Sequence, residues 1–170
     1  MREINQAGLT LIKSFEGIPD GDPTTVNKDP YLDPVGIWTI GWGHAIWVNG
    51  GFLRGPENRK VAKALYLGGL TLKQCETLLK GDLADFCRDV EALLKVKVTD
   101  NQFAALVSFA FNVGINALKN SSILRLVNGG DFKGAAGRFL LYNKATKNGV
   151  KVVLAGLTRR REAEAKLFMA

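Results

Sequence analysis

The sequence is poor in the side chains that most often carry metal or redox chemistry. It contains one histidine, His44, and two cysteines, Cys75 and Cys87. The cysteines lie in a segment typical of one helix, which separates their Cα atoms by about 18 Å. A disulfide requires Cα atoms within about 7 Å. Since there is also no CxxC pair and no second histidine at a ligand spacing, the sequence predicts reduced cysteines, no metal and no cofactor.

Long hydrophobic runs are absent as well. No apolar run approaches the roughly 20 residues that span a bilayer. The N-terminal stretch MREINQAGLTLIKSFEG is amphipathic and has neither the apolar core nor the cleavage site of a signal peptide. We therefore expect synthesis in a cytoplasm and no membrane anchor.

The charge is positive, with 23 basic and 16 acidic residues among 170, a net charge of +7. This excess favours an anionic partner such as nucleic acid, an acidic membrane surface or a cell-wall polymer. A nucleic-acid-binding module requires clustered basic residues with exposed aromatics, and only Arg159–Arg161 form such a cluster. We therefore expect no nucleic-acid partner. We also expect a monomer, although nothing in the charge pattern bears on the oligomeric state.

Two kinds of local pattern divide the chain. Asn5 and Gly17 bracket a helical pattern over residues 4–15, and residues 31–53 are typical of a small antiparallel sheet. Capping boxes begin further helices at Thr71 and Thr99. Helices are also predicted at about 116–127, 131–142 and 158–168, with no other strand.

These elements predict an α+β fold that is mostly α, in a single domain over residues 1–170. A small antiparallel β lobe occupies about 17–55, and a larger helical lobe contains 1–16 and about 57–170. We expect a ligand-binding cleft between the lobes.

The segment GIWTIGWGH, residues 36–44, is predicted to be a strand despite its three glycines. Alternation places Trp38, Ile40 and Trp42 on one face. Thr39, Gly41 and Gly43 then form a nearly bare second face. We expect this bare face to lie against a ligand.

Two carboxylates could act at such a face. Glu16 ends the first helix, where the helix dipole disfavours a negative charge. Asp33 begins the turn that leads into the strand carrying Thr39. Each residue alone also has an ordinary structural interpretation, but two carboxylates flanking a scissile bond are what glycoside hydrolysis requires.

Several motifs resemble those of one family in the same order. They are LIKSFEG, YLDPVGIWTIGWGH, LTLKQCETLLKGDL, VTDNQFAALVSFAFNVG, SSILRLVNGGDFKGAAGRF and GLTRRREAEAKLF. Together they cover nearly the whole chain, which resembles the phage-type lysozymes (endolysins) of glycoside hydrolase family 24. The resemblance implies a lysozyme-like fold and a muramidase that cleaves peptidoglycan between N-acetylmuramic acid and N-acetylglucosamine.

The resemblance also implies roles for individual residues. Glu16 becomes the general acid, Asp33 polarises the attacking water, and Thr39 holds that water. Inversion at the anomeric carbon is the expected outcome. The glycines at 41 and 43 become the sugar-binding floor.

Supporting residues follow from the same resemblance. His44 is expected to pair with Asp82, and an arginine to pair with Glu16, with Arg160 favoured over Arg159. Three residues of the helical lobe are expected to reach the cleft. They are Ser108, Asn112 and Tyr142, although Asn112 could instead cap its helix and Tyr142 could be a buried aromatic.

The chain departs from the family pattern at one point that bears on the site. Glu16 and Asp33 are 17 residues apart, whereas the family pattern has nine. The longer loop supplies three rival carboxylates: Asp20, Asp22 and Asp29. A second insertion-like segment covers about 48–70.

Two alternatives remain open at this point. A wall-binding protein that had lost catalysis would lack an intact Glu, Asp and Thr set, and a lytic transglycosylase would need only the glutamate. As an endolysin, the protein would act on the cell wall in the periplasm, and it would need a holin-type membrane lesion to arrive there.

Overall fold

The computed structural model describes residues 2–170. Its contacts divide the chain into a strand unit, residues 16–82, and a helical unit, which contains the chain up to Phe15 and residues 83–170. One boundary falls inside α3 (Leu72–Leu93), after Asp82. Residues 57–82 therefore lie with the strands, whereas the sequence alone placed them in the helical lobe because they are helical.

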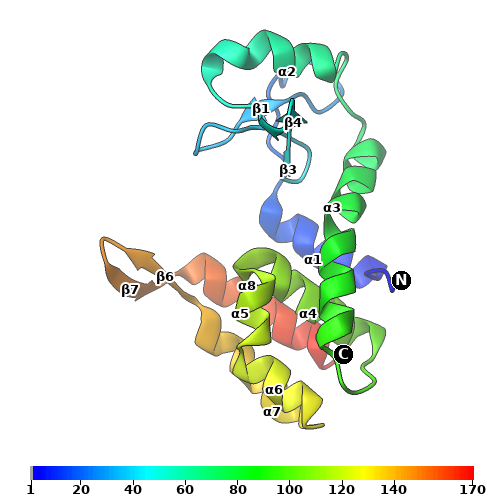
Figure 1. The fold of residues 1–170 in the computed structure, drawn as a ribbon, viewed down its shortest axis with the longest axis vertical. Coiled ribbons are helices and arrows are strands. Elements are labelled where there is room, and N and C mark those ends of the chain that lie inside the picture. The colour runs from blue at the N-terminus through cyan, green and yellow to red at the C-terminus, as the bar shows by residue number, and fades with distance from the viewer. Residues whose placement is uncertain (1) are drawn as a thin grey trace. The chain divides into compact units, whose positions relative to one another are not determined.

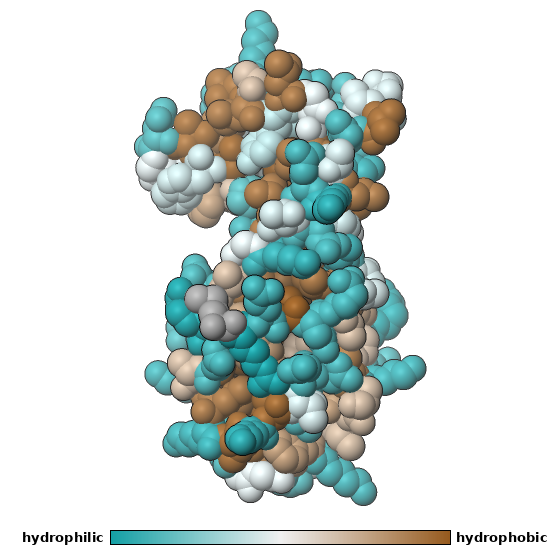
Figure 2. Space-filling view, turned by 90° about the vertical axis from the view of Figure 1, so that its right-hand side faces the viewer, coloured by the Kyte–Doolittle hydropathy of each residue, from teal (hydrophilic) through white to brown (hydrophobic). Residues whose placement is uncertain are grey.

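The strand unit contains the small antiparallel sheet that the sequence predicts. β1 (Tyr31–Leu32), β2 (Trp38–Ile40) and β3 (His44–Ala45) pair in that order, and β4 (Trp47–Val48) pairs with β5 (Gly51–Phe52). A short 3-10 helix (Pro56–Asn58) and α2 (Arg59–Leu65) follow. The buried core of this unit consists of Trp38, Ile40, Ile46 and Ala62. Apolar residues also reach its surface in the space-filling view (Figure 2).

The predicted strand over residues 36–44 is wrong in its length, and so is the bare face inferred from it. β2 ends at Ile40, and Gly41 and Gly43 have φ values of +62° and +83°, which no strand residue adopts. The alternation of side chains between the two faces therefore ends at Ile40, before Gly41 and Gly43. A side chain on Gly41 would meet Cys75, with a Cβ–Cβ distance of 3.1 Å, whereas one on Gly43 would meet nothing within 4 Å. Gly41 faces the interior, and Gly43 faces open space.

The helical unit begins with α1 (Gln6–Glu16), whose last residue belongs to the strand unit. The Oδ1 atom of Asn5 accepts the backbone N–H of Gly8 at 2.9 Å, which confirms the predicted N-cap. α4 (Asp100–Val113) starts with the predicted capping box of Thr99 and Gln102, and eight consecutive residues of α4, 103–110, are buried. The box at Thr71 is confirmed too, because Thr71 and Gln74 exchange hydrogen bonds at the start of α3.

Four shorter helices, a hairpin and the long helix α8 complete the helical unit (Figure 1). They are α5 (Ile115–Lys119), α6 (Ser122–Asn128), α7 (Phe132–Arg138) and the 3-10 helix Phe139–Tyr142, followed by α8 (Ala155–Phe168) after the hairpin. α8 packs against α4, and α6 against α7. No helix among residues 2–170 has both the length and the apolar character needed to cross a bilayer.

The hairpin corrects the prediction of no strands outside residues 31–53. β6 (Lys144–Lys147) and β7 (Val150–Val153) pair in register around Asn148 and Gly149. Both turn residues have positive φ, 50° and 77°, as a two-residue hairpin loop requires. The Asn-Gly pair was the sequence signal, but the flanking strands are almost wholly exposed and lack apolar alternation.

His44 links the sheet of the strand unit to α3. Its Nδ1 atom lies 3.0 Å from both carboxylate oxygens of Asp82, which confirms the predicted pair. The hydrogen bond to Asp82 raises the pKa of His44 above its ordinary value. Burial opposes this rise, and the negative charge of Asp82 adds to it. The ring is therefore held at the start of β3 by a charge-assisted contact.

Replacing either glycine by alanine should lower stability, but not equally. Positive φ costs a non-glycine residue about 1–2 kcal/mol at both positions. Gly41→Ala also forces a contact with Cys75, and overpacking typically costs about 1–3 kcal/mol more. Urea unfolding should therefore give Gly41→Ala a lower free energy of unfolding than Gly43→Ala. Equal losses would show that Cys75 moves aside freely.

The His44–Asp82 pair should make stability depend on pH in one direction. Because the folded pKa is raised above about 6.5, the contribution is complete below that pH and is lost as the pH rises through the folded pKa. The melting temperature of the native protein should exceed that of Asp82→Asn most at low pH, with the gap closing above pH 6.5. NMR titration of the single histidine checks this directly. A pKa that Asp82→Asn leaves unchanged would contradict it.

Candidate active site

Asp33 is a carboxylate fixed by its own turn. It follows β1 directly, and its Oδ1 atom accepts the backbone N–H groups of Val35 at 2.9 Å and Ile37 at 2.8 Å. Backbone bonds from Asp33 N to Ile37 O and from Gly36 N to Asp33 O close the same turn. The Oδ2 atom has no hydrogen-bond partner among the described residues. One oxygen therefore holds the group in place, and the other is available for chemistry.

Thr39 lies close to Asp33 because β1 and β2 are paired. Thr39 is the cross-strand partner of Tyr31, which precedes Asp33 by two residues. Its side chain is 4% exposed, and its hydroxyl donates to the backbone oxygen of Ile37 at 3.2 Å. The hydroxyl proton is thus already used in a hydrogen bond, while the oxygen lone pairs can still accept a hydrogen bond from water or a sugar.

Tyr31 belongs to this group of residues, and sequence reasoning missed it. Burial raises the pKa of its hydroxyl, and the negative charges of Asp33 and Glu16 raise it further, against a backbone hydrogen bond from Gly43. The phenol therefore experiences the fields of both candidate carboxylates. Strand alternation was the available signal, since residues two apart share a face.

Glu16 is the last residue of α1, as predicted, and its side chain is half-buried. It belongs to the strand unit together with Asp33, Thr39 and Tyr31. The charge of Glu16 acts on Tyr31, so the two groups share one neighbourhood. The strand unit thus brings together two carboxylates, a threonine hydroxyl and a phenol.

The three rival aspartates in the 18–30 loop are engaged in holding that loop. Asp20 accepts the backbone N–H groups of Asp22 and Asp29, and pairs with Lys28 at 3.0 Å. Asp22 accepts from Thr24, a bond that lowers its pKa, and pairs with Lys63 at 3.4 Å. The Asp29 side chain is buried and accepts the hydroxyl of Thr25. These contacts are what an ordered surface loop requires, and they occupy its carboxylates.

Arg160 belongs to a buried ionic cluster in the helical unit, which sequence reasoning did not foresee. Its Nε donates to Oε1 of Glu164 at 3.2 Å, and its guanidinium lies over the ring of Phe15 at 5.7 Å. Arg161, fully buried, pairs with Oε2 of Glu164 at 2.9 Å. Pairing of Arg160 or Arg159 with Glu16 stays a prediction.

Two of the predicted cleft residues also contact this cluster. Ser108 has no solvent exposure and donates to Glu164 at 2.8 Å, so it supports the interior and does not line a cleft. Asn112 is exposed and accepts from Arg161 at 2.6 Å. It does not cap its helix, because the backbone N–H of Gly114 bonds to Ala110.

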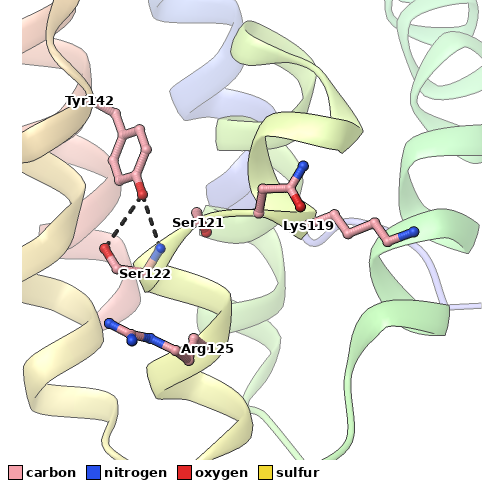
Figure 3. A pocket seen from close by; sticks show the side chains of 6 residues that line it. Lys119, Ser121, Ser122, Arg125 and Tyr142 are labelled. Carbon is pink, nitrogen blue, oxygen red and sulfur yellow. Dashed lines mark hydrogen bonds between the residues drawn. The ribbon is translucent and has the colours of Figure 1, made fainter.

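Tyr142 lines a cavity within the helical unit. Its hydroxyl accepts the backbone N–H of Ser122 at 3.0 Å, and its ring packs edge-on against Phe109 at 5.2 Å. Lys119 and Arg125 line the same cavity (Figure 3). The aromatic is therefore both partly packed and partly open to a ligand.

Comparison with known proteins identifies the family. The phage lysozyme family model matches residues 14–164. The endolysin of Bacillus phage B103 is 42% identical over 98% of this chain, which spans about half (54%) of that relative's length. Among solved structures, a mutant of P22 lysozyme has a TM-score of 0.76 at 30% identity, with 100% of both chains covered. The muramidase domain of SpmX from Asticaccaulis excentricus has a TM-score of 0.76 at 36% identity, covering 100% of this chain and 99% of its own. The chain belongs to the phage lysozyme family.

Proposed function

We propose that this chain hydrolyses the β-1,4 bond between N-acetylmuramic acid and N-acetylglucosamine in bacterial peptidoglycan, as an endolysin that releases phage progeny. The observation that carries the proposal is the carboxylate of Asp33, clamped through Oδ1 by two backbone N–H groups while Oδ2 is left open. A catalytic group must be held close to its productive geometry, and the two backbone hydrogen bonds to Oδ1 restrain the Asp33 side chain in this way.

In this mechanism Glu16 protonates the oxygen of the leaving sugar. Oδ2 of Asp33 accepts a proton from the attacking water and stabilises the positive charge that develops on the sugar ring. Thr39 accepts the water's second hydrogen bond through its oxygen. Tyr31, within the field of both carboxylates, is placed to bind a sugar hydroxyl or acetamido group.

We infer that the reaction inverts the anomeric carbon, because Asp33 is assigned to water and not to direct attack on carbon. Proton NMR of the first-formed anomer tests this assignment. A lytic transglycosylase would give an anhydro sugar in place of a free reducing end. Mass spectrometry of the soluble muropeptides separates these two reactions.

We further propose that the protein acts as a monomer on the wall in the periplasm, after synthesis in the host cytoplasm. Access to the wall would then depend on a membrane lesion of the holin type. Expression in Escherichia coli tests this dependence. Lysis should follow only when the inner membrane is permeabilised, and lysis by the chain alone would overturn the holin requirement.

Glu16→Gln should lower turnover by at least about 10²-fold, because the amide nearly matches the carboxyl in shape but cannot donate the acid proton. The measurement is the loss of turbidity of outer-membrane-stripped cells, with the melting temperature as the control for folding. A folded variant that keeps more than about a tenth of native activity would remove Glu16 from its role as general acid.

Asp33→Asn tests the role of Oδ2 alone. The carbonyl of asparagine can still accept the N–H groups of Val35 and Ile37, but the amide nitrogen in place of Oδ2 cannot accept a proton from water. Turnover should fall by about 10²-fold or more while stability changes little. Asparagine at position 20, 22 or 29 provides the matched controls. Each should change turnover less than about threefold, although each loosens its loop. A larger loss of turnover from any control than from Asp33→Asn would move the second carboxylate into the loop.

A further inference from the structure

The excess positive charge of the chain lies in the helical unit. This unit contains 16 basic and 8 acidic residues, whereas the strand unit contains 7 and 8. From Phe132 to Arg161 there is no acidic residue at all. The hairpin of β6 and β7 lies within this stretch, so its neighbours along the chain include cations but no carboxylate.

Residues 144–153 of the hairpin extend beyond the packed part of the helical unit. The backbone N–H of Leu154 donates to Asn143 O at 3.0 Å and closes the base of the hairpin, and the Asn143 amide donates to the Thr158 hydroxyl of α8 at 3.1 Å. Beyond this base the two strands project away from the helices (Figure 1). Among the described residues, the backbone hydrogen bonds of 144–153 run only between the two strands. The edges and most side chains of the hairpin can therefore meet a partner.

Cross-strand pairs place a cation beside an apolar side chain at both ends of the hairpin. Lys144 pairs with Val153 near the base, and Lys147 pairs with Val150 at the turn. Directly opposed residues of antiparallel strands project from the same face, with Cβ atoms about 5 Å apart. Val150 and Val153 are 62% and 57% exposed, and both lysines are exposed too. Each pair therefore presents an ammonium group and a branched apolar group to solvent together.

The cations and apolar side chains of the hairpin are not matched by other parts of the chain. Lys144, Lys147 and Lys151 form no ion pair with any residue in the range 2–170. The apolar surface continues at the base, where Leu141 and Leu154 are exposed. Apolar groups that are exposed together generally mark an interaction surface. Residues 141–154 are here called the hairpin surface.

Two requirements decide what the hairpin surface can bind. The lysines require a partner with several negative charges, and the valines and leucines require a partner with an apolar phase. A polyanion such as poly(glycerol phosphate) meets the first requirement only. A single-stranded nucleic acid would need aromatic side chains for its bases, and residues 143–154 contain none. An anionic lipid bilayer meets both requirements, because its phosphates lie directly above its acyl chains.

We propose that the hairpin surface binds reversibly to anionic lipid bilayers. The valines enter the boundary between headgroups and acyl chains, and the flexible stems of the lysines let their ammonium groups stay at the level of the phosphates. The contact is peripheral, since a hairpin with few apolar side chains does not span a bilayer. It goes beyond the proposed function and is independent of it, because it requires neither Glu16 nor Asp33.

The first test measures co-sedimentation of the native protein with lipid vesicles. One set of vesicles contains phosphatidylglycerol, and the other contains only phosphatidylcholine, which has no net charge. The partition coefficient should be at least about tenfold larger for the phosphatidylglycerol vesicles, since each lysine gains from the negative surface potential. About 0.5 M sodium chloride should remove most of this difference. Equal partition into both sets, or partition into neither, would overturn the proposal.

Two variants separate the apolar contribution from the charged one. The apolar variant, Val150→Thr with Val153→Thr, keeps the branched shape and the preference for a strand but replaces one methyl group of each side chain by a hydroxyl. The charge variant replaces the three lysines of the hairpin by glutamine: Lys144→Gln, Lys147→Gln and Lys151→Gln.

Each variant has a matched control elsewhere in the chain. The apolar control is Val26→Thr with Val61→Thr, which changes two exposed valines of the strand unit. The charge control removes three exposed lysines that form no ion pair within residues 2–170: Lys60→Gln, Lys73→Gln and Lys97→Gln.

Both hairpin variants should bind phosphatidylglycerol vesicles more weakly than the native protein, the apolar variant by about threefold or more and the charge variant by about tenfold or more. Each control should stay within about twofold of native. If the apolar variant binds like its control, the surface recognises negative charge alone and the assignment to lipid is wrong. Competition by poly(glycerol phosphate) would then identify a polyanion as the partner. If the charge variant matches its control, net charge and not the hairpin explains the binding.

Hydrolysis of purified, lipid-free peptidoglycan distinguishes the hairpin surface from a substrate site. Both hairpin variants should keep kcat and KM within about twofold of native, with the melting temperature as the control for folding. A rise in KM that parallels the loss of vesicle binding would assign the hairpin to the wall and overturn the lipid proposal. If the native protein binds vesicles as expected but cleaves no peptidoglycan, the proposed function fails and the lipid inference stands.

Discussion

The helical unit depends on one buried carboxylate. Glu164 has no solvent exposure, and burial raises its pKa because a charge is costly in a medium of low polarisability. Arg161, Ser108 and Arg160 offset this cost with opposite charges and hydrogen bonds. Both arginines lie on α8 with Glu164, and Ser108 donates to it from α4. Arg160 and Arg161 also donate to the backbone oxygen of Ser108 and to Asn112 on α4, so separating α4 from α8 would break all three hydrogen bonds. Removing one partner from such a cluster generally costs more than the pair contributes.

The carboxylates of Glu164 and Asp33 are both held in place, but they differ in how many of their oxygens have partners. Side chains contact both oxygens of Glu164, and no water reaches it. Asp33 is held through one oxygen by backbone N–H groups, which carry no full charge. Its other oxygen keeps its hydrogen-bonding capacity. Oε1 of Glu164 accepts hydrogen bonds, and Oε2 meets Arg161 as an ion pair without a hydrogen bond, so both oxygens are enclosed by partners of the fold. A carboxylate that is held through one oxygen only can act on a substrate through the other.

The features that the sequence predicted correctly are local ones. The Asn5 cap, the two capping boxes and the position of Glu16 depend on residues within four positions of each other. The pairing of His44 with Asp82 came from family resemblance and not from spacing. The prediction of a bare face was wrong because strand periodicity assumes a continuous strand. Two glycines with positive φ, Gly41 and Gly43, end the strand instead. The burial of Glu164 could not be predicted, because its surroundings, REAEAK, are also typical of an exposed helix surface. Only tertiary packing buries this residue.

The division of charge between the units suits the chemistry assigned to each. A general acid acts only while it is protonated, and nearby cations favour the ionised carboxylate. The unit that contains Glu16 and Asp33 has nearly balanced charges, with 7 basic and 8 acidic residues, so it does not add a strong positive field of its own. On the proposed function, net positive charge favours attraction to an anionic wall, and the helical unit carries this charge, with 16 basic and 8 acidic residues.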